Sequence, residues 1–126
     1  MPLETGLVGR ATLSVGESDT AIAMRSGAVP VLATPRLVAL CEQAACQAVE
    51  ELLEEGQTTV GMRVQFDHLA PTAVGASVTA EATLERVEGR RLIFTVSASD
   101  PGGLVGAGKV TRVVVEEERF LKRARH

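Results

Sequence analysis

Aromatic residues and surplus positive charge are both scarce in this sequence of 126 residues. It contains no Trp, no Tyr and three Phe, and its 13 Lys and Arg residues are outnumbered by 16 Asp and Glu. A surface that binds nucleic acid needs a basic face, and it often uses aromatic side chains on which bases stack. The composition therefore argues against a nucleic-acid-binding protein.

Cysteines and long apolar runs are also few. Cys41 and Cys46 lie five positions apart, which on a helix points them about 140° away from each other. We expect both to be reduced thiols, as is usual in the cytoplasm. No apolar run reaches the length of a membrane span, and the first residues lack the pattern of a signal peptide. The sequence predicts one soluble, cytoplasmic domain over residues 1–126, with no membrane partner.

One long helix is predicted between Pro35 and Glu55. Thr34 is a suitable N-cap, Pro35 suits the first helical position, and Gly56 suits a left-handed terminator. Apolar residues form an arc wider than a surface helix needs: Leu37, Leu40, Cys41, Ala44, Ala45, Ala48, Val49, Leu52 and Leu53. Other parts of the chain should therefore cover most of this helix.

The remaining patterns predict strands. Period-two alternation and turn residues such as Gly89 and Pro101-Gly102-Gly103 mark four strands after the helix and a less distinct one before it: 58–68, 77–87, 91–99, 104–117 and 7–15. These elements predict an α+β fold in which an antiparallel meander wraps one long central helix. A valine-rich last strand would leave apolar area exposed, so we predict a dimer. The basic tail is expected to be a frayed terminus.

Glu42 is the first candidate for chemistry. Its helical angle places it between Val38, Val49 and Leu53, at the margin of the apolar arc. A carboxylate that loses water there is prepared to act as a general base or a nucleophile. The alternative is an ordinary, partly exposed helix residue.

His68 is the second candidate, because it continues the alternating series Val60, Met62, Val64 and Phe66. That phase directs its imidazole toward the helix. It is either a satisfied core histidine or the partner of Glu42 in a base-and-orienter pair. Metal binding is not expected, since one usable His and two separated Cys do not match a zinc template.

Three further residues suggest ligand contacts. Thr34 lies where the free N–H groups of a helix start can bind a carbonyl oxygen or an anion. Arg36 in the first turn opposes the helix dipole unless a negative partner arrives. Gly61 interrupts a strand without forming a turn, which often permits close approach by a ligand.

Thr34, Glu42, Gly61 and His68, in this order of helix and strand, resemble the fluoroacetyl-CoA thioesterase-like branch of the hotdog-fold superfamily. The resemblance extends from about Ala33 to the end, through VQFDHLAPT and the VTAEATLERVEGRRLIFTVSASD hairpin. It implies an acyl-CoA thioesterase without a cofactor. It also implies a homodimer with two sites at the subunit interface, each wrapped around a pantetheine arm.

The matching catalytic set implied by the resemblance is Thr34, Glu42 and His68. Glu42 would attack the acyl carbon or activate water, while Thr34 and His68 would position it and manage proton transfer to the leaving thiolate. Backbone N–H groups near the helix start or Gly61 would stabilise the oxyanion. The fluoroacetyl-selective member has aromatic lid residues before its Thr, whereas residues 25–33 here read RSGAVPVLA. We therefore expect a different acyl group, short or medium in length.

Two other functions fit parts of the pattern. A hotdog hydratase would pair an Asp with a His, but Asp67 and His68 are consecutive and face opposite sides of a strand. A non-catalytic acyl-CoA binding or sensing module would use Glu42 and His68 only to line the pocket. Release of free CoA would distinguish the enzyme from that module.

Overall fold

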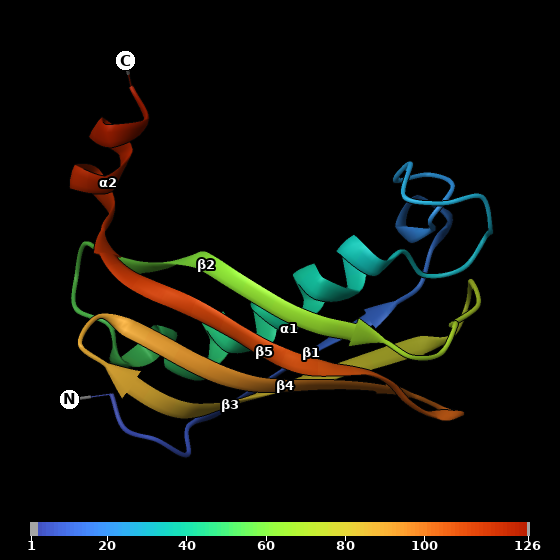
Figure 1. The fold of residues 1–126 in the computed structure, drawn as a ribbon, viewed down its shortest axis with the longest axis horizontal. Helices are drawn as coiled ribbons and strands as arrows, with labels where there is room; N and C mark the ends of the chain where they lie inside the picture. Colours follow the sequence, from blue (N-terminus) through green and yellow to red (C-terminus); the bar gives the residue numbers. More distant parts are fainter. Residues whose placement is uncertain (1–2, 126) are drawn as a thin grey trace.

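The computed structural model describes residues 3–125 and shows a curled sheet around one long helix (Figure 1). Its elements, in chain order, are β1 (Val8–Ser14), α1 (Thr34–Val49), β2 (Gln57–His68), β3 (Ser77–Glu88), β4 (Arg91–Asp100), β5 (Gly103–Glu116) and α2 (Glu117–Ala124). Short 3-10 turns occupy Glu17–Asp19 and Glu50–Leu52. The predicted α+β plan and all five predicted strands are confirmed.

The sheet is antiparallel throughout, with the spatial order β1-β3-β4-β5-β2. The predicted meander is correct for β3, β4 and β5. The first two strands lie at the two edges, because β1 pairs with β3 and β2 pairs with β5. One side of β2 therefore has no neighbouring strand in the described part of the chain.

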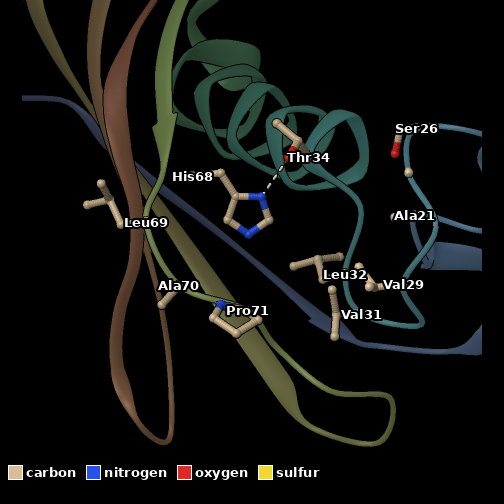
Figure 2. A pocket seen from close by; sticks show the side chains of 11 residues that line it. Ala21, Ser26, Val29, Val31, Leu32, Thr34, His68, Leu69, Ala70 and Pro71 are labelled. Carbon is tan, nitrogen blue, oxygen red and sulfur yellow. Dashed lines mark hydrogen bonds between the residues drawn. The ribbon is translucent and has the colours of Figure 1, made fainter.

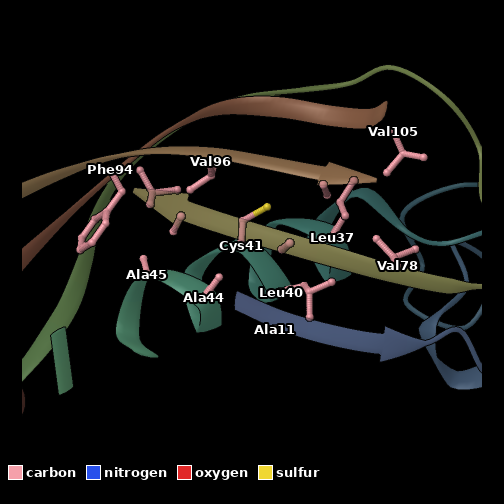
Figure 3. Packing of buried hydrophobic residues seen from close by; sticks show 14 of the residues in the cluster. Ala11, Leu37, Leu40, Cys41, Ala44, Ala45, Val78, Phe94, Val96 and Val105 are labelled. Atoms are coloured by element: carbon pink, nitrogen blue, oxygen red, sulfur yellow. The ribbon is translucent and has the colours of Figure 1, made fainter. Parts of the chain in front are cut away.

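The core lies between α1 and the concave face of the sheet (Figure 3). Six residues of α1 are buried, and all belong to the predicted apolar arc: Leu37, Leu40, Cys41, Ala44, Ala45 and Val49. Strand β1 crosses α1 closely, since a side chain on Gly9 would collide with the backbone of Ala44 and Ala48. Phe94 is the largest fully buried side chain.

The prediction of a helix through Glu55 is wrong. Helix α1 ends at Val49 and continues only as the 3-10 turn Glu50–Leu52, after which Leu53 is extended. Glutamates at 50, 51, 54 and 55 place negative charge at the negative end of the helix dipole, which disfavours continuation. Gly56 has the predicted positive φ of 85°, but it serves the turn into β2 and not the end of α1.

The predicted single apolar row along β2 is also wrong, because a β-bulge interrupts it. Gly61 pairs with Arg112 and Arg63 pairs with Thr111, so Met62 is an extra residue. A bulge changes which side chains face the helix. Thr59 and Gly61 face α1 before it, whereas Phe66 and His68 face α1 after it.

The tail corrects the expectation of a frayed terminus. Residues 117–124 form α2, with Glu117 and Glu118 in its first turn and Lys122 and Arg123 in its last. This charge order suits the helix dipole. Neither helix of the described chain is long and apolar enough to cross a membrane.

Candidate functional site

Thr34 and His68 form a direct pair at one end of the sheet (Figure 2). Thr34 Oγ1 lies 2.8 Å from Nδ1 of His68, at the end of β2. The prediction of Thr34 as the N-cap is wrong, since Ala33 occupies that position and Thr34 is the first residue of the helix. Because the Thr34 hydroxyl makes no capping hydrogen bond, it is available to the imidazole.

This pair lines an open cavity of about 320 Å³. The other nitrogen of His68, Nε2, is buried and has no hydrogen-bond partner among the described residues. Buried polar atoms are usually hydrogen-bonded, and exceptions often mark functional sites. His68 is therefore not a satisfied core histidine.

The walls of the cavity come from two loops. The segment before α1 is held by bridges from Thr20 to Leu32 and from Val31 to Ala73. It and the segment after His68 supply mainly small and aliphatic side chains: Ala21, Val29, Val31, Leu32, Leu69 and Pro71 (Figure 2). None of the lining residues is aromatic apart from the imidazole of His68, and the aliphatic side chains share the lining with the polar groups of Ser26, Thr34 and His68.

Glu42 belongs to a second cluster, on the middle of the sheet. Its Oε2 accepts a hydrogen bond of 2.8 Å from Nη1 of Arg112, and its side chain is 31% exposed. It is thus a partly exposed helix residue, which confirms that alternative over a desolvated carboxylate, and it is paired with Arg112. Arg112, which sequence reasoning missed, comes from β5 and is 8% exposed. Its alternation with Val110 and Val114 was the available signal, because that phase directs a charged side chain into the core face.

Gly61 lies against the same carboxylate. A Cβ on Gly61 would lie 2.6 Å from Oε2 of Glu42 and 3.5 Å from Nη1 of Arg112. The predicted close approach at Gly61 is therefore present, but the group that approaches is a side chain of the protein itself. Glycine leaves room for the ion pair between Glu42 and Arg112.

The structure brings together Thr34 with His68, and Glu42 with Gly61, but it does not join the two clusters within one chain. Thr34 and Glu42 are eight helical positions apart, a rise of about 12 Å. Gly61 and His68 are seven strand positions apart, about 20 Å. The cavity at His68 has no contribution from Glu42. The expectation that both groups face one space is therefore not met by a single chain.

Arg36 has a partner within the protein. Its Nε donates a 3.0 Å hydrogen bond to Oδ1 of Asp19, and both side chains are largely buried. Asp19 supplies the negative charge that the first turn of α1 was expected to attract. The guanidinium group of Arg36, which was predicted to contact substrate, thus forms an ion pair with a carboxylate of the same chain.

Both cysteines are free thiols, as predicted. Burial, and then the neighbouring Glu42 carboxylate, raise the pKa of the Cys41 thiol to about 11. At neutral pH Cys41 is therefore a protonated thiol and not a nucleophile. No group of three or more His, Cys, Asp and Glu side chains suited to a metal ion occurs among residues 3–125.

Comparison with known proteins gives one consistent family. The family model described as "Fluoroacetyl-CoA-specific thioesterase" matches residues 15–118. The fluoroacetyl-CoA thioesterase of Streptantibioticus cattleyicolor is 39% identical over 95 residues, which span 75% of this chain and 68% of that protein.

Solved structures agree with the sequence matches. A variant of the fluoroacetyl-CoA-specific thioesterase, in complex with fluoroacetate and CoA, superimposes with a TM-score of 0.88 at 32% identity, covering 94% of this chain and 99% of that chain. A hot-dog-like protein from Thermanaerovibrio acidaminovorans gives 0.88 at 34% identity, covering 97% and 90%. The predicted hotdog fold is thereby confirmed.

Proposed function

This chain belongs to the fluoroacetyl-CoA-specific thioesterase family and hydrolyses acyl-CoA thioesters, and we propose that it does so with Thr34, Glu42 and His68. The observation that carries the assignment of these residues is the Thr34–His68 pair, whose free Nε2 faces a cavity between two loops. The proposed reaction needs no cofactor, since a carboxylate and an imidazole supply the acid and base.

The chemistry requires a nucleophile, an oxyanion site and a proton for the leaving group. Glu42 either attacks the acyl carbon or takes a proton from a water molecule that attacks it. The C–S bond then breaks, and CoA leaves as a thiolate that accepts the proton taken from water. Where Glu42 attacks directly, water afterwards hydrolyses the mixed anhydride, which releases the free acid and Glu42 and supplies that proton. In the tautomer in which Nδ1 of His68 accepts a hydrogen bond from the Thr34 hydroxyl, Nε2 carries the hydrogen and can donate a hydrogen bond to the leaving thiolate.

A second copy of the chain would bring Glu42 of one protomer close to His68 of the other. Five consecutive residues in the middle of β2, residues 61–65, are exposed on an edge strand, and Met62 and Val64 are 49% and 44% exposed. Exposed apolar edges of this kind favour strand pairing. Antiparallel pairing of two β2 edges about a two-fold axis near Val64 and Gln65 would set Gly61 beside the partner's His68.

That arrangement makes the site a product of two chains. Glu42 and Gly61 of one protomer would face the Thr34–His68 pair of the other, and the two-fold axis would create two such sites. The proposed homodimer therefore follows from the separation of the two clusters as well as from the exposed strand. It also gives a pantetheine arm a cleft between the subunits.

The acyl group is proposed from the cavity lining. The similar enzymes are named for fluoroacetyl-CoA, and their activity suggests a small acyl-CoA substrate here. The cavity beside His68 has about 320 Å³ of space, and aliphatic side chains form most of its lining away from Ser26, Thr34 and His68, which suits a short or medium aliphatic acyl chain. We accordingly propose a substrate with more carbon atoms than fluoroacetate. The guanidinium group of Arg36 could bind substrate only if its ion pair with Asp19 broke, so we assign no step of the reaction to Arg36.

Thiol release from a panel of acyl-CoA thioesters tests the function. The wild type should release CoA, and Glu42→Gln and His68→Asn should each lower kcat about 10²-fold or more. Glu42→Gln keeps the size of the side chain and an oxygen that accepts from Arg112, whereas His68→Asn gives a smaller polar side chain that lacks the basic ring. Thermal unfolding would verify that the variants fold. Binding of acyl-CoA without CoA release by the wild type would instead identify a sensing module.

A further inference from the structure

Arg112 is held at all three nitrogens of its guanidinium group. Nε donates to Oγ1 of Thr59 at 3.0 Å, Nη2 donates to the Thr59 carbonyl oxygen at 2.9 Å, and Nη1 donates to Oε2 of Glu42 at 2.8 Å. Two contacts to one residue of β2 fix the plane of the group. The third contact then fixes one oxygen of the carboxylate.

The burial of the two partners differs. The Arg112 side chain is 9% exposed and the Glu42 side chain is 31% exposed. A buried guanidinium needs a compensating charge, because removing it from water is costly. Glu42 supplies that charge on its inner oxygen, while the exposed fraction of its side chain leaves the carboxylate open to a ligand.

The other oxygen of Glu42 is not engaged in the same way. Oε1 has no hydrogen bond to any residue between 3 and 125, whereas Oε2 is bound by Arg112 and approached by Gly61. A carboxylate held through one oxygen presents the other in a fixed direction. Fixed placement of a reacting group accounts for a large part of catalysis, and misplacement by about 1 Å can cost about 10²-fold in rate.

We propose that Arg112 is the positioning residue for Glu42, holding Oε2 so that Oε1 faces the acyl group or the attacking water. This inference rests on the proposed function, since it requires Glu42 to be the reacting carboxylate. Arg112 acts through Glu42 and touches no substrate. Lysine cannot replace it fully, because a single ammonium group cannot bind both Thr59 and Glu42 in the same planar arrangement.

The test is a set of steady-state kinetic measurements on Arg112→Gln and Arg112→Lys. Arg112→Gln should lower kcat about 10²-fold, while KM stays within about threefold because no substrate contact is lost. Arg112→Lys should recover part of kcat by restoring the charge. Arg10→Gln is the matched control, since Arg10 forms an ion pair with Glu81 on the exposed surface and should retain wild-type kinetics.

A double-mutant cycle separates positioning from mere structural support. In the Glu42→Gln background, Arg112→Gln should cause no further loss of kcat, because its effect passes through the carboxylate. A folded Arg112→Gln enzyme with kcat within twofold of wild type would overturn the inference. Should Glu42→Gln itself keep full activity, the proposed catalytic set fails, which is a different result.

Thr59→Val provides the test if Arg112→Gln does not fold. Val has nearly the shape of Thr but lacks the hydroxyl that binds Nε of Arg112. Arg112 then keeps its contacts to Glu42 and to the Thr59 carbonyl with one restraint fewer. We expect kcat to fall about tenfold with unchanged KM, a smaller loss than the full misplacement of the carboxylate causes. Unchanged kcat in the folded variant would contradict the inference.

Discussion

A methyl group on Gly61 would lie 2.6 Å from Oε2 of Glu42, the oxygen that Arg112 binds. Because real Cβ atoms do not approach so closely, the carboxylate of a Gly61→Ala variant must move away from Arg112. We expect kcat to fall about 10²-fold with little change in thermal stability. Gly16→Ala is the control, since its Cβ would meet only ordinary contact. A fully active Gly61→Ala enzyme would show that the position of Oε2 is unimportant.

The hydroxyl of Thr34 gives a second prediction. It lies 2.8 Å from Nδ1 of His68 and fixes the ring orientation. Thr34→Val removes the hydroxyl at nearly constant shape and should lower kcat, whereas Thr34→Ser keeps it and should retain most activity. Steady-state kinetics of the two variants compares them directly. Equal activity of the Val and Ser variants would mean that His68 does not depend on this bond.

Cys41 provides a prediction about pH and stability. Its pKa is raised from 9.0 to about 11 by burial and by Glu42. The thiol proton dissociates from the unfolded chain at a lower pH than from the folded chain. Rising pH therefore stabilises the unfolded state relative to the folded state. This contribution to the free energy of unfolding should be constant below pH 9 and should decrease between pH 9 and about 11.

Cys41→Ala isolates the effect, because Ala fits the buried helix position and carries no proton. Chemical denaturation of both proteins across this range gives the difference in free energy of unfolding. Between pH 9 and about 11, the free energy of unfolding of the wild type should decrease relative to that of Cys41→Ala. A pH-independent difference would show that Cys41 titrates alike in both states.

Local patterns predicted most of the fold. Alternation and turn residues located every strand to within two residues, as with 77–87 against Ser77–Glu88. The strand order was harder, because pairing of β2 with β5 joins segments about fifty positions apart and leaves no mark in either segment alone. The bulge at Met62 was hidden for the same reason, since it is defined only by the register against Thr111 and Arg112.

The candidate site shows the same limit. Glu42 and His68 were singled out from helical angle and strand alternation, and the resemblance to the family joined them with Thr34, but their contacts were not predicted. Arg112 is separated from Glu42 by 70 positions, so the alternation in β5 could place its side chain on the core face but could not show which residue it pairs with. Helix α2 was missed for a different reason: the sequence contains a local signal, acidic residues followed by basic ones that suit the helix dipole, but the tail was interpreted as a frayed terminus.

The aliphatic cavity makes a prediction about substrate length. Burying one methylene contributes about 0.8 kcal/mol, which is about fourfold in kcat/KM for each added carbon until the cavity is full. A series of saturated acyl-CoA thioesters should therefore show rising kcat/KM beyond acetyl, with fluoroacetyl-CoA a poor substrate. Val29→Phe narrows the wall before α1 and should shift the optimum to shorter chains. Strong preference of the wild type for fluoroacetyl-CoA would contradict the assignment of this cavity to the acyl group.

Complementation between inactive subunits tests whether one site uses two chains. Glu42→Gln and His68→Asn subunits, co-expressed with different affinity tags, allow the mixed dimer to be purified. If Glu42 acts with the partner's His68, one of its two sites carries both substitutions and the other carries neither. The mixed dimer should then regain about half of the wild-type activity per dimer. Wild-type subunits carrying the same two tags are the control. If each site instead uses Glu42 and His68 of one chain, both sites of the mixed dimer carry a substitution and the activity stays as low as in the parents.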